Sequence, residues 1–96
     1  SAAVGIEENA LESSLSIFPN PTNDQANISF TLVDGQDVSI EIYNVVGSVV
    51  MSKSLNKVQA GNHLETLDFS NMNAGLYYVK LVAGSMSATK KLTVNK

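Results

Sequence analysis

From Ile17 onward, the chain alternates apolar and polar residues in short runs that are separated by turn residues. The clearest run covers residues 26–32, where Ile28, Phe30 and Leu32 alternate with polar residues. A period of two places one set of side chains in a core and the other in water, which indicates β-strands. The pattern predicts strands over residues 17–18, 26–32, 38–43, 48–54, 63–69, 76–83 and 88–95.

Turn residues such as Asp34-Gly35 and Gly84-Ser85 separate these runs. They recur at roughly the 8–12-residue spacing that is typical of immunoglobulin-like sandwiches. No run between turns has a 3.6-residue period, which argues against βαβ topologies. We therefore predict an all-β fold, an immunoglobulin-like seven-stranded antiparallel β-sandwich.

Residues 1–15 differ from the rest of the chain, because they are small, acidic and without an apolar stripe. We expect a flexible leader over residues 1–15, ordered at most near Leu15, followed by one domain over residues 16–96. The longest apolar stretch is only a few residues, so we expect no transmembrane segment.

The composition excludes several classes of function. Six lysines, no arginine and nine acidic residues give a net charge of −3, which argues against binding to nucleic acid. The absence of cysteine excludes disulfides, thiolate zinc sites and a cysteine nucleophile. We expect no catalytic residue, no cofactor and no metal site.

His63 is the single histidine, and a zinc site needs three or four ligands. Glu65 lies two positions on and shares the strand face of His63, but the two residues are too few for such a site. A polar residue at a strand edge is therefore the favoured interpretation of His63.

The acidic residues fall in turns and at positions expected to face outward, where solvated carboxylates are typical: Asp24, Asp34, Asp37, Glu41, Glu65 and Asp68. The Asn- and Asp-containing loops near residues 20–25 and 34–37 lack the spacing of a calcium loop, so turn formation is favoured over calcium binding.

Tyr77 shares a strand face with Val79 and Leu81, so its ring should pack in the core with the hydroxyl at the rim. Together with Tyr43 and Tyr78, it would make a poor platform for stacking sugars. Glycines at positions 47 and 75 are expected to adopt positive φ, where a β-carbon would clash.

Several motifs follow one another in order: Phe18-Pro19-Asn20-Pro21, Asn27-Ile28-Ser29-Phe30, Tyr43-Asn44-x-x-Gly47, Gly61, Ala74-Gly75-Leu76-Tyr77, and Lys90-Lys91 with a final Lys96. Over residues 16–96 this set resembles the type A C-terminal sorting domain of the type IX (Por) secretion system of Bacteroidetes. The sequence departs from the usual family residues at Phe18, Ser48 and Met72-Asn73. The two prolines are expected to end the first strand and let the chain cross between sheets.

The resemblance implies a secretion signal that directs a larger N-terminal cargo through the periplasm to the outer-membrane translocon. A sortase-like cysteine peptidase would then remove it, leaving the cargo at the cell surface or in the extracellular space. The family motif or recognition residues would be Pro19, Asn20, Pro21, Gly47, Gly61, Gly75, Tyr77, Lys90, Lys91 and Lys96. The cleavage region would be Gly5, Ile6, Glu7, Glu8, Asn9 and Ala10.

Two alternatives stay open at this point. The domain as a whole could be a non-catalytic adhesive or carbohydrate-binding module. The C-terminal lysines could protect a strand edge from indiscriminate pairing, rather than dock to an acidic receptor or lipid surface.

Overall fold

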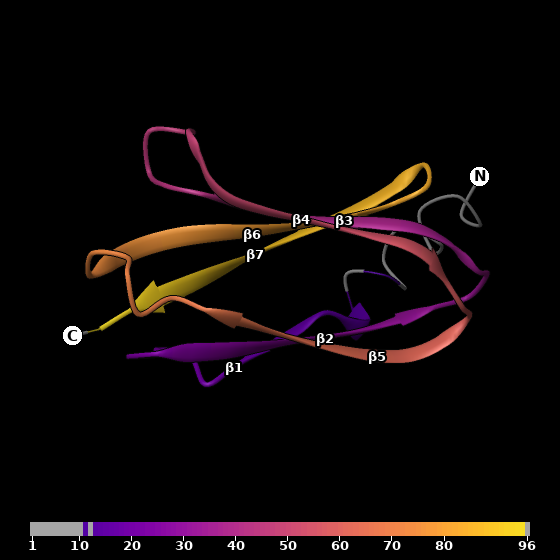
Figure 1. The fold of residues 1–96 in the computed structure, drawn as a ribbon, viewed down its shortest axis with the longest axis horizontal. Coiled ribbons are helices and arrows are strands. Elements are labelled where there is room, and N and C mark those ends of the chain that lie inside the picture. The colour runs from indigo at the N-terminus through magenta and orange to yellow at the C-terminus, as the bar shows by residue number, and fades with distance from the viewer. Residues whose placement is uncertain (1–10, 12, 96) are drawn as a thin grey trace.

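The computed structural model describes Leu11 and residues 13–95, and within these it contains seven antiparallel strands in two sheets (Figure 1). The strands are β1 (Ser16–Phe18), β2 (Gln25–Leu32), β3 (Gln36–Tyr43), β4 (Val49–Val58), β5 (Gly61–Asp68), β6 (Gly75–Ala83) and β7 (Met86–Val94). One sheet, sheet A, has the order β1-β2-β5, and the other, sheet B, has the order β4-β3-β6-β7. The predicted all-β, antiparallel architecture is confirmed.

The core lies between the two sheets and is built from alternate residues of the strands. Strand β2 contributes Ile28 and Phe30, and β6 contributes Val79 and Leu81, all completely buried. Tyr77 is also buried, and its hydroxyl donates a hydrogen bond to the Asn73 carbonyl (2.7 Å). The predicted inward position of this ring is therefore confirmed.

Strand β4 is longer than the sequence predicts. It continues through residues 55–58, because Leu55 and Val58 still pack against the core. Lys57, one residue before the end of the strand, adopts a positive φ of 55°. Residues 59–60 alone therefore separate β4 from β5, which begins at Gly61 with a φ of 122°.

The segment between β1 and β2 crosses from sheet A to the edge of sheet B. Thr22 forms a parallel bridge with Val94; its N–H donates to the Thr93 carbonyl (2.9 Å), and its own carbonyl accepts from the Asn95 N–H (2.7 Å). Two residues earlier, the Asn20 side chain also forms two hydrogen bonds to the backbone of β7. Its Nδ2 donates to the Lys91 carbonyl (3.0 Å), and its Oδ1 accepts from the Thr93 N–H (3.1 Å). This supports the expected crossing between sheets, and we call Asn20 and Thr22 the edge clamp.

The end of the expected leader belongs to the core. Leu11 and Leu15 are each only 2% exposed, and the Leu15 N–H donates to the Leu11 carbonyl (3.1 Å), which closes one helical turn. The Ser14 hydroxyl accepts a hydrogen bond from the Thr31 N–H (3.1 Å), in the position that a longer β1 would occupy beside β2. Residues 1–10 and 12 lie outside the described residues, so the division of the chain at residue 16 stays a prediction.

Gly47 and Gly75 have the predicted positive φ angles, 88° and 154°. A β-carbon at either position would meet no atom within 4 Å beyond the neighbouring residues of the chain, so tertiary packing leaves space for one. The constraint is the conformation of the local backbone, which L-residues with a side chain rarely adopt.

We predict that Gly75→Val lowers the free energy of unfolding by about 1–3 kcal/mol, because valine would be held in this unfavourable region. Equilibrium denaturation of the chain measures the change. The matched control is Ala74→Val in the same exposed turn, where no positive φ is required. Equal denaturation midpoints for the wild type and Gly75→Val would contradict the assignment of an unfavourable backbone conformation to Gly75.

We predict that Asn20→Ala increases amide exchange at Thr93, because it removes the side-chain acceptor of this N–H. The loss of two exposed hydrogen bonds should cost about 1–2 kcal/mol of stability. Amide hydrogen exchange followed by NMR measures the protection of Thr93, with Asn71→Ala at another exposed turn as the control. Unchanged protection of Thr93 in Asn20→Ala would show that the clamp does not hold the strand.

Candidate functional site

Strand β7 carries Lys90 and Lys91, two of the recognition residues that the resemblance implies, and its side chains alternate between the core and the solvent. Leu92 and Val94 are buried, whereas Thr89, Lys91 and Thr93 are exposed. Lys90 lies opposite the buried Val79, yet it stays exposed because β7 is an edge strand. Lys96 lies outside the described residues.

The edge clamp determines how the end of β7 can be recognised. From Lys91 to Asn95, the backbone of the strand is bonded to β6 on one side and to Asn20 and Thr22 on the other. A further strand therefore cannot add to this stretch without displacing the clamp. The outward side chains remain accessible to a partner.

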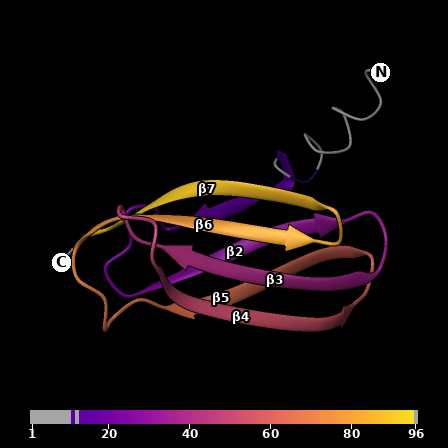
Figure 2. The same ribbon diagram turned by 90° about the horizontal axis from the view of Figure 1, so that it is seen from above.

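The structure brings some of the motif residues together and separates others. Gly75 lies opposite Val94, so the start of β6 and the Pro19-Asn20-Pro21 segment meet at the end of β7. Gly47 lies in the β3–β4 hairpin. Gly61 lies opposite Leu32, which places it at the far end of sheet A. Figure 2 shows that the hairpin and the end of β7 are at the same end of the molecule.

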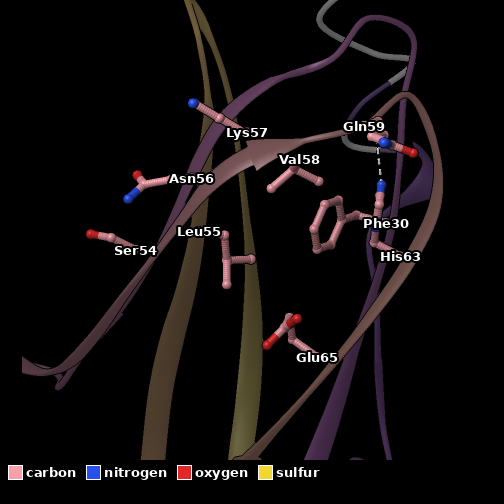
Figure 3. A pocket seen from close by; sticks show the side chains of 9 residues that line it. All are labelled: Phe30, Ser54, Leu55, Asn56, Lys57, Val58, Gln59, His63 and Glu65. Atoms are coloured by element: carbon pink, nitrogen blue, oxygen red, sulfur yellow. Dashed lines mark hydrogen bonds between the residues drawn. The ribbon is translucent and has the colours of Figure 1, made fainter.

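A groove of about 510 Å³ opens between the edge strands β4 and β5 (Figure 3). Phe30, Leu55 and Val58 form its apolar floor. His63 stacks on Phe30 with the ring centroids 5.5 Å apart, and its Nε2 lies 2.5 Å from the Gln59 carbonyl oxygen. His63 thus lies on a strand edge after the Gly61 turn, as the sequence indicates.

The orientation expected for Glu65 was wrong. Its carboxylate faces the gap between the sheets and accepts from Lys53 Nζ (2.7 Å), so the pair joins the edges of β4 and β5. The spacing of residues along the chain could not reveal this ion pair, because Lys53 and Glu65 belong to different sheets. The described residues contain no group of three or more His, Asp or Glu side chains that could hold a metal ion.

The outer face of sheet B carries two of the three tyrosines of the chain. Tyr43 of β3 lies directly opposite Tyr78 of β6, and both are half-buried. The Tyr43 hydroxyl donates to Glu41 Oε1 (2.7 Å), and this hydrogen bond raises the pKa of Tyr43. Both residues could be placed on the outer face from the alternation, but only the register makes them neighbours.

The geometry thus places the recognition candidates at one end of a two-sheet domain, around the clamped end of β7. Among the residues that the structure describes, no helix is long and apolar enough to cross a membrane. The cleavage region expected from Gly5 to Ala10 lies outside those residues.

No curated protein is significantly similar to the chain. The model of one protein family, the secretion system C-terminal sorting domain, matches residues 16–95. This match covers nearly all of the described domain and includes the edge clamp, the Gly75 turn and strand β7. The chain therefore belongs to the family of type IX secretion system C-terminal sorting domains.

Proposed function

We propose that this domain carries a larger cargo protein across the outer membrane by presenting the clamped β7 strand to the type IX translocon. The observation that carries the proposal is the convergence of family motif residues on this strand. Asn20 bonds to its backbone, and Gly75 starts the strand beside it. A strand held on both sides presents its side chains in one arrangement, which suits recognition by a receptor.

The proposed partners supply the chemistry that the domain lacks. A sortase-like cysteine peptidase would separate the domain from its cargo, and the thiol nucleophile would belong to that enzyme, since this chain has no cysteine. The cargo would then stay at the cell surface or in the extracellular space. In this proposal the domain is itself not catalytic and binds no cofactor.

We also infer that the sandwich is of the immunoglobulin type. The pairing of β2 with β5, β3 with β6, and β6 with β7 corresponds to strands B with E, C with F, and F with G of that fold. Strand β4 pairs with β3, like strand C′ of the variable-type domains.

The alternative function is an adhesive or carbohydrate-binding module. The specific observation in its favour is the adjacent pair Tyr43 and Tyr78, since sugars stack on exposed aromatic rings. Against it, both rings are only partly exposed, and the Tyr43 hydroxyl is already bonded to Glu41.

We predict that residues 1–96, fused behind a periplasmic reporter, move the reporter to the cell surface or medium in a host that has the secretion system. In the same host without the system, the reporter should remain in the periplasm. Fractionation and reporter assay measure the distribution. Equal distributions in the two hosts would contradict the proposed function, and binding of the fusion to a polysaccharide matrix would favour the carbohydrate-binding alternative.

We predict that processing occurs upstream of Leu11, within residues 1–10. A peptidase needs accessible, extended backbone, and Leu11 and Leu15 are held in the core. Mass spectrometry of the C-terminus of the released cargo locates the cut. A cargo that retained Leu11 or any later residue would contradict the prediction, and one that retained Phe30 would show that the domain is cut internally.

A further inference from the structure

A continuous row of side chains crosses the outer face of sheet B near the end of β7. The register places Val49 opposite Tyr43, Tyr43 opposite Tyr78, and Tyr78 opposite Lys91, so the row runs through all four strands of this sheet. Directly opposed residues lie on the same face of a sheet and contact one another. The row therefore joins an apolar residue, two aromatic rings and a cation in one surface.

The β3–β4 hairpin extends this row into solvent. It rises from the outer side of sheet B, at the end of the molecule where β7 ends (Figures 1 and 2). Val45 and Val46 at its tip are 68% and 79% exposed, and Val49 is 50% exposed. Valines that are at least half exposed and gathered at one protruding tip are typical of a site of interaction.

The hairpin is held in one shape by its own hydrogen bonds. Asn44 Oδ1 accepts from the N–H groups of Val46 (3.1 Å) and Ser48 (3.0 Å). The Asn44 N–H donates to the Ser48 carbonyl (3.0 Å), and the Gly47 N–H donates to the Asn44 carbonyl (3.0 Å). Valine has few side-chain rotamers, so little conformational entropy would be lost when this tip is bound.

The outer face of sheet A has a different character. Its polar side chains bond to one another across the strands, Thr31 to Asn62 (2.7 Å) and Thr66 to Asn27 (2.7 Å). Two apolar side chains are also exposed on this face, Phe18 (45%) and Leu64 (57%), and Leu64 provides a matched reference for an exposed apolar side chain. The apolar tip and the aromatic pair thus belong to sheet B.

The charge of the row indicates the chemistry of its partner. Lys91 and Lys80 project from this face, and the acid beside them, Glu41, already accepts a hydrogen bond from Tyr43. Among the described residues, the one ion pair is Lys53–Glu65, which lies on the other side of sheet B. Glu41 keeps its negative charge when it accepts this hydrogen bond, and it lies directly opposite Lys80. Lys91, opposite Tyr78, is therefore the cation of the row that has no acid directly across from it, and it complements a carboxylate of a partner.

We propose that this surface, the hairpin–tyrosine face formed by Tyr43, Val45, Val46, Val49, Tyr78 and Lys91, docks on a protein that offers carboxylates beside an apolar recess for the hairpin tip. The proposal rests on the proposed function, in which that protein is the outer-membrane component that receives the domain.

Two other occupants fit the face less well. Two copies of this chain that met through this face with the two-fold axis near Lys80 and Lys91 would bring like charges together, which is repulsive. A lipid surface is expected to be bound by tips with Trp, Phe or Leu and flanking Lys or Arg. Residues 44–52 contain none of these.

The test uses the reporter fusion with single substitutions on this face: Val46→Ser, Tyr78→Ser and Lys91→Glu. Leu64→Ser is the matched control, since it removes an exposed apolar side chain from the opposite face. Val46→Ser, Lys91→Glu and Leu64→Ser should keep the wild-type denaturation midpoint, because these side chains are exposed. Tyr78 is half-buried beside Tyr43, so Tyr78→Ser is expected to lower the midpoint, and its export is compared at a temperature at which the variant is folded. We expect about tenfold or greater loss of exported reporter for Val46→Ser and Tyr78→Ser, as for residues at the centre of an interface, and no loss for Leu64→Ser.

A binding measurement identifies the occupant. The purified fusion is mixed with outer-membrane vesicles from a host with the secretion system, with vesicles from a host lacking it, and with protein-free liposomes of the same lipids. We expect binding to the first vesicles alone and its loss in Val46→Ser. Equal binding to the protein-free liposomes would identify a lipid partner and overturn the proposal, as would displacement by soluble polysaccharide.

The two proposals fail in different ways. If the wild-type fusion is exported and the three face variants are exported equally well, the hairpin–tyrosine face is not the docking surface, while the sorting function stands. If the wild-type fusion is not exported, the sorting function fails. Binding to the vesicles and its loss in Val46→Ser would still support the docking face in that case.

Discussion

The pairing of the Asn20–Thr22 segment with the end of β7 is the interaction on which the rest of the arrangement depends. Strand β1 is three residues long and cannot by itself join the sheets, so the chain crosses over and bonds to β7. The Asn20 side chain offers one donor and one acceptor, which imitates the backbone of a neighbouring strand. The first and last parts of the domain are thereby connected, and β7 is held on both edges near its end.

The opposite side of the domain is closed in a different way. Strands β4 and β5 are the edges of separate sheets, and the Lys53–Glu65 pair spans the gap between them. Charged side chains that point inward at an edge discourage pairing with further strands. At the third opening, beside the short β1, Leu11 and Leu15 fill the core. The domain is thus closed in three places. Hydrogen bonds hold the end of β7, an ion pair joins the edges of β4 and β5, and a helical turn fills the core beside β1.

These three features protect the edges of the sheets, and the outer face of sheet B with its hairpin is the docking surface that we propose. The clamp prevents strand addition at the end of β7, so a partner must bind side chains there. The row from Val49 to Lys91 provides them on rigid strands, and the hydrogen bonds of Asn44 hold the tip beside them. The family to which the chain belongs implies export to the cell surface or extracellular space, and a compact signal with one presented face agrees with that role.

The amino-acid sequence by itself determined the strands, the face to which most side chains belong and the positions of the positive-φ glycines. These features depend on near neighbours: the period of two, the turn residues and the absence of a side chain at Gly47 and Gly75. The ordered motifs also identified the family. Only the tertiary structure decided the inward position of Glu65, the burial of Leu11 and the adjacency of Tyr43 and Tyr78. Each of these depends on contacts between residues far apart in the chain, whose register is set by packing the whole core.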